Sequence, residues 1–486
     1  MEGLKDKTIN GVAWETTSTI IKFAVNFVVS IILARLLTPD DYGLIGIVMI
    51  FVTIADCVTI SGFFTSLIQK KDANAADYNT MFISNMVSSV SLYVILFFGA
   101  PFIADFFHRS ELVGILRVQS LTLIISAFAL VQRARFYKNL DFKTQAIISF
   151  ITAFFSGFLG ISLAYLGFGV WALVYSTVLT SLLSTVLNCV FSKWMPRVQF
   201  SVRSFKELFG YGWKILAGEL LENIWMQLYQ VVVGRWYSPA TLGQYSRGKG
   251  FVDLFATNIY VITRGVTFSA LCQVQDDETR RKEAFRKMIK VLIFITAICV
   301  FGVAAIGKSM VLVLIGEKWL PSVVFLQILC FGSLLYPINA TNMNLLKSQG
   351  RSDLYLVLSI IKKVLDIGPI LLGIFVDIYW MVWGSVVTNW VGFFLYAHFA
   401  GKNISYTARQ QFVDLLPSLG VATAMAVPVW LISFLTISPF LLLPLQIIIG
   451  GAIVIGICEL TKIEEYKEVK SIAISTFNKL IAKVKR

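Results

Sequence analysis

Residues 35–43 read Arg35-Leu36-Leu37-Thr38-Pro39-Asp40-Asp41-Tyr42-Gly43, and they lie between two long apolar stretches. Residues 235–243 read Arg235-Trp236-Tyr237-Ser238-Pro239-Ala240-Thr241-Leu242-Gly243. The arginine, the hydroxyl residue, the proline and the glycine return at an offset of 200 residues. Because the residue before a proline is disfavoured in the α-helical conformation, each stretch is expected to end one helix and begin the next. The sequence therefore predicts one helical reversal that is used twice.

The repeat extends beyond these reversals. Gly11-Val12-Ala13-Trp14 returns as Gly210-Tyr211-Gly212-Trp213, and Phe64-Thr65-Ser66-Leu67-Ile68-Gln69 returns as Phe268-Ser269-Ala270-Leu271-Cys272-Gln273. Self-similarity at a fixed period indicates one structural unit used more than once. We therefore predict an N-terminal six-helix lobe over 1–200 and a C-terminal six-helix lobe over 201–405. Two further helices over 406–460 and a cytoplasmic amphipathic tail over 461–486 are expected to follow.

The composition indicates a polytopic membrane protein. Of the 486 residues, 57% are hydrophobic and 14% are charged, and the mean hydropathy is +0.76. A soluble domain carries about 25% charged residues. In a soluble protein, the net charge of +14 would suggest nucleic-acid binding. Here the basic residues fall between apolar runs, so they instead indicate which side of the membrane each loop occupies.

The predicted fold class is all-α, with about fourteen transmembrane helices and a pseudo-twofold axis along the membrane normal. A helix needs about 20 apolar residues to cross the hydrocarbon. Six spans, an even number, precede the second copy of the repeated unit, so the two lobes are expected to enter the membrane in the same direction. The predicted spans cover 10–35, 42–69, 78–105, 111–134, 143–166, 169–192, 206–234, 239–270, 286–307, 319–346, 352–376, 378–400, 410–436 and 439–459.

Loop charges predict that both termini are cytoplasmic. With the N-terminus inside, the cytoplasmic segments carry most of the lysines and arginines that lie between spans. The outer loops carry only Arg35, Arg109, Arg235, Lys308 and Lys318. This asymmetry follows the positive-inside rule.

Ionisable residues inside predicted spans need an explanation, because a charge at the bilayer centre costs about 2.5–3.5 kcal/mol on insertion scales. Glu15 and Lys22 share one face of the first span, and Lys214 and Glu222 share one face of the seventh, with Glu219 nearby. At the repeat offset, the two helices carry opposite charges at equivalent positions. We predict a hydrated central cavity in which these charges pair across the lobes. The alternative is that each charge is satisfied within its own lobe.

The eighth span adds Arg247, Lys249, Asp253 and Arg264. Cations in a wet cavity suit a phosphate-bearing substrate, and arginine binds phosphate through its bidentate fork. The alternative for Arg247 and Lys249 is that their charged ends reach the outer headgroups. The candidates for substrate binding are Arg247, Lys249, Arg264, Lys22 and Lys214, and those for gating or ion coupling are Glu15, Glu219, Glu222, Asp56 and Asp253.

Two further positions have structural interpretations. Asp56 is the lone acid of the second span and is a candidate for binding a coupling ion, although acceptance of hydrogen bonds from a neighbour is the favoured alternative. In the eleventh span, Lys362 or Lys363 is expected to pair with Asp366 at helical spacing. The aromatic residues are expected to face lipid or the membrane interface, so no function is assigned to them.

Several classes of function lack their motifs. No G-x-x-x-x-G-K-[ST] occurs, so the chain is not expected to hydrolyse ATP. His108 and His398 are too few and too separate for a metal site, and no Cys/His cluster is present. We expect no cofactor beyond a coupling proton or sodium ion, and no nucleic-acid partner.

The motifs Gly11-x-x-Trp14, Leu33-Ala34-Arg35-Leu36-Leu37-x-Pro39-x-x-Tyr42-Gly43 and Leu242-Gly243-Gln244-Tyr245-Ser246-Arg247 resemble those of a known group. They are similar to the polysaccharide transporters, of the Wzx type and like those for colanic acid, within the multidrug/oligosaccharidyl-lipid/polysaccharide (MOP) exporter superfamily. The resemblance implies a flippase, not an enzyme, in the bacterial inner membrane. It would move undecaprenyl-pyrophosphate-linked repeat units by alternating access, for lipopolysaccharide, capsule or exopolysaccharide synthesis.

The resemblance also implies a lipid-linked oligosaccharide substrate, with Arg247 as a cavity cation, and partnership with polysaccharide polymerase machinery. Two rival functions stay open. An ion-coupled multidrug exporter belongs to the same superfamily, but cationic drugs favour an acidic cavity. A membrane-embedded glycan polymerase needs a sizeable outer loop, which the predicted topology does not provide.

Overall fold

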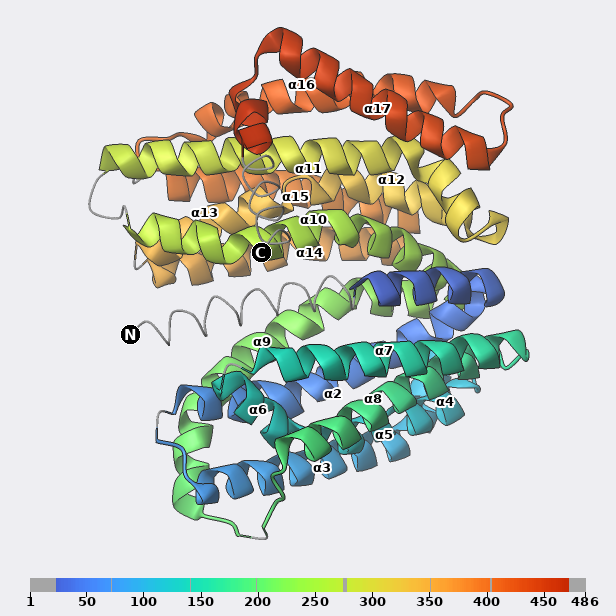
Figure 1. Cartoon of the computed structure of the whole chain (residues 1–486), viewed down its shortest axis with the longest axis vertical. Helices are drawn as coiled ribbons and strands as arrows, with labels where there is room; N and C mark the ends of the chain where they lie inside the picture. Colours follow the sequence, from blue (N-terminus) through green and yellow to red (C-terminus); the bar gives the residue numbers. More distant parts are fainter. Residues whose placement is uncertain are drawn as a thin grey trace, which may run out of the picture. The chain divides into compact units, whose positions relative to one another are not determined.

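The computed structural model describes residues 23–70, 72–139, 141–197, 199–273, 278–349, 351–402 and 404–471 (Figure 1). Every regular element in these residues is a helix, and no strand occurs among them. The predicted all-α fold class is therefore confirmed. The chain divides into two compact units, Met1–Gly243 and Gln244–Arg486. The predicted lobes, 1–200 and 201–405, and their pseudo-twofold symmetry stay predictions.

The first unit opens with a helix over Phe23–Leu36. It continues with α2 (Pro39–Gln69), α3 (Ala75–Phe107), α4 (Leu112–Gln119), α5 (Leu121–Ala127), α6 (Leu130–Lys138), α7 (Phe142–Tyr165), α8 (Val170–Ser192) and α9 (Val202–Trp236). The boundary with the second unit falls inside α10 (Pro239–Gln273), whose first residues belong to the first unit.

The second unit contains the rest of α10 and eight further elements. They are α11 (Glu278–Leu314), η1 (Glu317–Trp319), α12 (Pro321–Ser333), α13 (Tyr336–Ser348), α14 (Ser352–Phe375), α15 (Ile378–Lys402), α16 (Ala408–Ile432) and α17 (Pro439–Thr461). A short helix over 464–471 follows α17.

The helices are long and apolar enough for a multi-pass membrane protein. In the described part of the chain, nine pass a test of length and hydropathy, or ten if the bent pair Leu112–Ala127 and Leu130–Lys138 is one span. A helix overlaps each of the predicted spans. The count of fourteen is nevertheless not confirmed. Helices such as α9 and α14 carry several ionisable side chains along their length, which sets them apart from the purely apolar helices.

Both reversals form as predicted. One helix ends at Leu36 and α2 begins at Pro39, while α9 ends at Trp236 and α10 begins at Pro239. Thr38 caps α2, since its hydroxyl accepts from the Asp41 N–H at 3.2 Å. The Asp41 carboxylate accepts in return from the Thr38 N–H at 2.9 Å, which completes a capping box. Ser238 caps α10 through the Thr241 N–H at 3.1 Å.

The two reversals also contact each other within the first unit. A Cβ atom on Gly43 would lie 1.8 Å from the carbonyl oxygen of Pro239. A Cβ atom on Gly243 would lie 2.0 Å from the carbonyl oxygen of Pro39. Each glycine therefore packs on the backbone of the other copy, and no larger residue fits at either position. We call this contact the glycine–proline crossing.

Small residues also bring α2 and α9 together along their length. A Cβ atom on Gly212 would lie 2.5 Å from the Gly62 carbonyl oxygen. The Ser66 hydroxyl donates to the Leu208 carbonyl at 2.9 Å. Close backbone approach at small residues is the usual means of helix association in membranes. The backbone of α9 is thereby fixed against α2.

The second unit is built around α11. Phe285, Ile289 and Ile293 are fully buried in a cluster with residues of α15 and α16. The short helix 464–471 also packs on this unit, because Tyr466 and Val469 join a cluster with Phe294, Val421 and Cys458. Two ion pairs hold it there: Lys287 with Glu468 at 2.5 Å and Lys290 with Glu465 at 3.4 Å. The rest of the predicted tail lies outside the described residues.

Candidate functional site

The predicted central cavity is lined by ionisable residues of the first, seventh and eighth predicted spans. Glu15 and Lys22 lie outside the described residues, and so does the side chain of Arg264, although α10 includes its backbone. The α9 charges Lys214, Glu219 and Glu222 are exposed on the first unit. Their exposure is compatible with a hydrated surface, but the pairing of Lys214 with Glu15, and of Glu222 with Lys22, stays a prediction.

On α10, the structure brings two of the candidates together. The Lys249 ammonium forms an ion pair with the Asp253 carboxylate one turn later, and the two side chains are 37% and 40% exposed. Arg247 lies elsewhere on this helix, with its guanidinium 5.5 Å from the ring centroid of the buried Trp319. A cation over an indole face is attracted by the ring quadrupole. Arg247 is therefore held in position by the second unit, whereas Lys249 is neutralised by its neighbour.

Asp56 lies half-buried on α2. The positive charge of Arg133, on α6, acts on its carboxylate. One turn along α2, Thr59 receives a hydrogen bond from the buried Ser89 of α3 at 3.4 Å. In the part of the chain that the structure describes, no side chain donates a hydrogen bond to Asp56 itself. The role of this residue in ion coupling stays a prediction.

The predicted pair on α14 is confirmed, and its members are Lys362 and Asp366. Their side chains are only 13% and 15% exposed. Thr388 of α15 donates to the Asp366 carboxylate at 2.6 Å and receives a hydrogen bond from Lys362 at 3.3 Å. The pair thus joins α14 to α15, as expected for a structural element.

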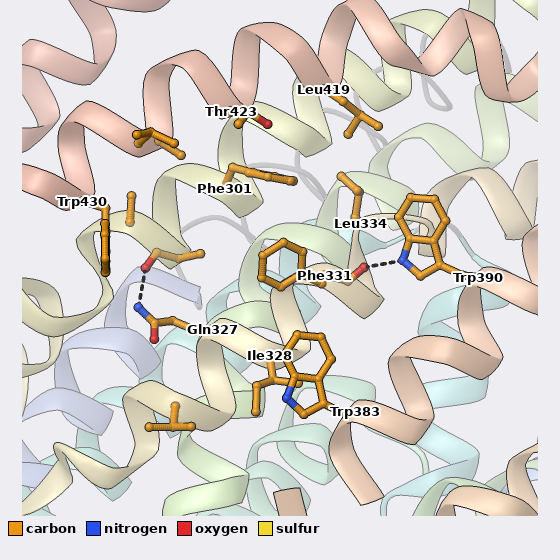
Figure 2. Close-up of a pocket in the computed structure, with 15 residues that line it drawn as sticks. Phe301, Gln327, Ile328, Phe331, Leu334, Trp383, Trp390, Leu419, Thr423 and Trp430 are labelled. Carbon is orange, nitrogen blue, oxygen red and sulfur yellow. Dashed lines mark hydrogen bonds between the residues drawn. The ribbon is translucent and has the colours of Figure 1, made fainter. Parts of the chain in front are cut away.

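An apolar pocket that the sequence did not predict lies in the second unit, between α11, α12, α15 and α16 (Figure 2). Its volume is about 710 Å³. Aromatic rings form much of its wall: Phe301, Phe331, Trp383, Trp390 and Trp430. From the sequence, the aromatic residues are expected to face lipid or the membrane interface and have no assigned function, so this grouping of rings was not anticipated. Trp383 and Trp390 are seven residues apart, and this helical spacing was the available signal.

Two of the polar groups that line this aromatic pocket are hydrogen-bonded to the protein backbone. The Gln327 amide donates to the Ala304 carbonyl at 3.2 Å, and the Trp390 indole donates to the Phe331 carbonyl at 3.3 Å (Figure 2). The walls therefore offer mainly carbon to an occupant. Such a surface is suited to an apolar ligand, because binding would remove apolar area without leaving buried polar groups unpaired.

Comparison with solved structures identifies the fold. The chain has the fold of a lipid II flippase MurJ in an inward closed conformation, with a TM-score of 0.76 and 13% identity over 94% of this chain and 99% of that one. It also resembles an inward-facing multidrug resistance MATE transporter of the MOP superfamily, with a TM-score of 0.59 and 16% identity over 82% of this chain and 99% of that one. The fold is therefore that of MOP-superfamily transporters.

The chain belongs to the family described as "Polysaccharide biosynthesis protein", which matches residues 32–324. The teichuronic acid biosynthesis protein TuaB of Bacillus subtilis (strain 168) is 25% identical over 73% of this chain and 74% of its own length. The lipopolysaccharide biosynthesis protein WzxC of Escherichia coli (strain K12) is 24% identical over 76% of each chain. The succinoglycan biosynthesis transport protein ExoT of Rhizobium meliloti (strain 1021) is 24% identical over 76% of this chain and 74% of its own. The resemblance stated from the reversal motifs is confirmed.

Proposed function

We propose that this protein moves undecaprenyl-pyrophosphate-linked polysaccharide repeat units from the cytoplasmic to the outer leaflet of the bacterial inner membrane. The movement occurs by alternating access, and it supplies the synthesis of lipopolysaccharide, capsule or exopolysaccharide. The family and the names of the relatives support a polysaccharide substrate. The protein acts without catalysis of its own and hands its cargo to polymerase machinery. Both termini lie in the cytoplasm, as the loop charges predict.

The aromatic pocket is the observation that carries this proposal. A substrate on a polyprenyl chain has a long apolar portion, and a pocket of about 710 Å³ lies within the usual range of about 300–1,000 Å³ for ligand sites. Phe301, Phe331 and Trp383 present apolar faces to it. We assign the pocket to a segment of the polyprenyl chain. The cations Arg247, Lys249, Arg264, Lys22 and Lys214 are assigned to the pyrophosphate.

An ion gradient drives the cycle in this proposal, with a proton or sodium ion bound at Asp56 or another of the acidic candidates, Glu15, Glu219, Glu222 and Asp253. The rival function is a multidrug exporter, because a MATE transporter shares the fold. An aromatic pocket also accepts an apolar drug. The cavity candidates are a mixed set that includes five cations, which can bind a phosphate-bearing substrate, whereas cationic compounds would suit an acidic cavity.

The first test is a flipping assay in proteoliposomes. A purified polyprenyl-pyrophosphate-linked oligosaccharide is incorporated, and the accessibility of its head group is followed with and without a proton or sodium gradient. We expect gradient-dependent flipping that is lost in Arg247→Ala and Arg264→Ala. Gradient-driven efflux of a cationic dye, in the absence of flipping, would overturn the proposal in favour of the drug exporter.

A second test fills the aromatic pocket with Ala426→Trp on α16. The indole takes the place of at least two methylene groups of the lipid, each of which contributes about 0.8 kcal/mol when buried, so flipping should slow about tenfold or more. The matched control is Ile448→Trp on α17, which adds an indole at a position that is 68% exposed and outside the pocket. Equal flipping rates in the two variants would remove the pocket from the mechanism.

A further inference from the structure

A second pocket, of different chemistry, lies in the second unit where α11 and α16 begin. Its volume is about 460 Å³. The lining side chains that carry charge are Lys282 and Arg286 of α11 and Arg409 and Asp414 of α16, with Tyr406 and Thr407 from the loop between α15 and α16. Three cations and one carboxylate leave this basic pocket with a net charge of about +2.

The one carboxylate is already fully engaged by the protein. Arg286 donates from Nε to Asp414 Oδ2 at 2.6 Å and from Nη2 to Oδ1 at 2.7 Å. The Tyr406 hydroxyl donates to Oδ2 at 2.6 Å. Burial raises the pKa of Tyr406, and the Asp414 carboxylate acts in the same direction, so the hydroxyl stays protonated. The Asp414 carboxylate is therefore occupied by donors of the protein itself and not by a ligand in the pocket.

The cations keep unused donors. The bidentate pair with Asp414 uses two of the five N–H groups of Arg286. Lys282 donates one hydrogen bond, to the Ser405 carbonyl at 2.7 Å, and has two N–H groups left. Arg409 is exposed and forms no ion pair with any residue that the structure describes. These three side chains line one cavity. Their remaining hydrogen-bond donors and their positive charge suit a negatively charged ligand.

The charged residues around this basic pocket do not neutralise its positive charge. Lys290, one turn beyond Arg286 on α11, also acts on Asp414 and is itself paired with Glu465 at 3.4 Å. Thr407 and Gln410 satisfy each other in the capping box of α16, with the Gln410 N–H donating to the Thr407 hydroxyl at 3.3 Å. The remaining lining residue, Val413, is apolar.

The position of the basic pocket along its helices indicates where its ligand comes from. After Lys290, α11 runs from 291 to 307 without a charged residue. After Asp414, α16 runs to its end at Ile432 without one. The charged side chains thus end where two apolar segments begin, which is the expected depth of lipid headgroups.

We propose that this basic pocket binds the phosphate group of a membrane lipid. The guanidinium groups of Arg286 and Arg409 bind the phosphate oxygens, and Lys282 adds a point charge. The phosphate comes either from an anionic phospholipid or from a polyprenyl pyrophosphate before it enters the transport cycle. Only the second source depends on the proposed function, and the site is distinct from the central cavity predicted around Arg247.

The test compares two double variants that remove the same charge. Lys282→Gln with Arg409→Gln removes two of the three lining cations and leaves the Arg286–Asp414 pair intact. Lys402→Gln with Lys462→Gln is the control, because both lysines are exposed and lie outside the basic pocket. Thermal unfolding in detergent establishes that both variants are folded. The single variant Arg409→Gln serves as a milder replacement, since its side chain is exposed.

Binding is measured by fluorescence anisotropy in detergent micelles. The probes are labelled phosphatidylglycerol and a labelled polyprenyl pyrophosphate, with phosphatidylcholine and inorganic pyrophosphate as comparisons. We expect the Kd for at least one anionic lipid to rise about tenfold for each cation removed from the pocket and to stay unchanged in the control. Equal affinities in the two double variants would overturn the proposal. Inorganic pyrophosphate that bound as tightly as the lipids would also overturn it, since a lipid-borne ligand would then not be required.

The two sources give different outcomes in the flipping assay. Loss of phosphatidylglycerol binding with normal flipping assigns the pocket to a phospholipid. Loss of polyprenyl pyrophosphate binding together with slower flipping assigns it to the substrate. Phosphatidylglycerol binding in a wild-type protein that flips nothing would overturn the proposed function and leave this site standing.

Discussion

At the scale of single residues, the glycine–proline crossing is the most constrained contact in the first unit. Gly43 and Gly243 each lie against a proline carbonyl of the other reversal. A carbonyl oxygen in a helix backbone cannot move aside as a flexible side chain can. A methyl group at either glycine therefore forces the two helix starts apart.

Gly43→Ala is expected to destabilise the protein by about 1–3 kcal/mol or more, the usual cost of overpacking. The measurement is thermal unfolding of the purified protein in detergent. Gly99→Ala is the matched control, since a Cβ atom there meets nothing within 4 Å. An unfolding temperature of Gly43→Ala equal to that of the control would show that the two reversals do not pack as described.

At the scale of elements, the ion pair between Lys362 and Asp366 joins helix α14 to helix α15. Both side chains are mostly buried, and Thr388 bonds to both. Removing one partner of a buried pair strands the other charge, at a cost of about 3–5 kcal/mol. Replacing both partners by apolar residues removes the stranded charge as well.

Lys362→Met alone is therefore expected to destabilise the protein strongly, whereas Lys362→Met combined with Asp366→Leu should restore most of the loss. Thermal unfolding of the single and double variants measures the difference. A double variant that is as unstable as the single one would contradict the structural role and favour a functional role for these charges.

The elements themselves could be predicted because each is encoded locally. Apolar runs indicated the helices, and the Thr38-Pro39 and Ser238-Pro239 caps indicated two of their starts. The aromatic pocket could not be predicted from the sequence, because its walls come from helices that are far apart in sequence. Phe301 and Trp430 meet only through the packing of α11 on α16. The Arg286–Asp414 pair has the same origin, since no spacing rule relates residues on different helices.

At the scale of the whole molecule, the ion coupling that we propose would connect the binding of an ion with movement of the substrate. Among the acidic candidates, Asp56 is influenced by the positive charge of Arg133. No side chain in the described residues donates a hydrogen bond to it. A carboxylate in this setting is able to exchange a proton or a sodium ion.

Asp56→Asn is expected to reduce gradient-stimulated flipping to the rate seen without a gradient, because the amide neither titrates nor carries charge. The proteoliposome assay, run with a proton and with a sodium gradient, measures this and identifies the ion. Asp105→Asn, at an exposed acid near the end of α3, is the control. Full stimulation in Asp56→Asn would move the coupling site to another acidic residue.

The glycine–proline crossing also has a consequence for biosynthesis. Pro39 leaves the ribosome 200 residues before Pro239, so the first reversal enters the membrane with its packing surface uncovered. The first unit reaches its final contacts only when the second reversal has been inserted beside it. A nascent chain that stops before residue 239 therefore lacks half of this contact and should be recognised as incomplete by membrane proteases.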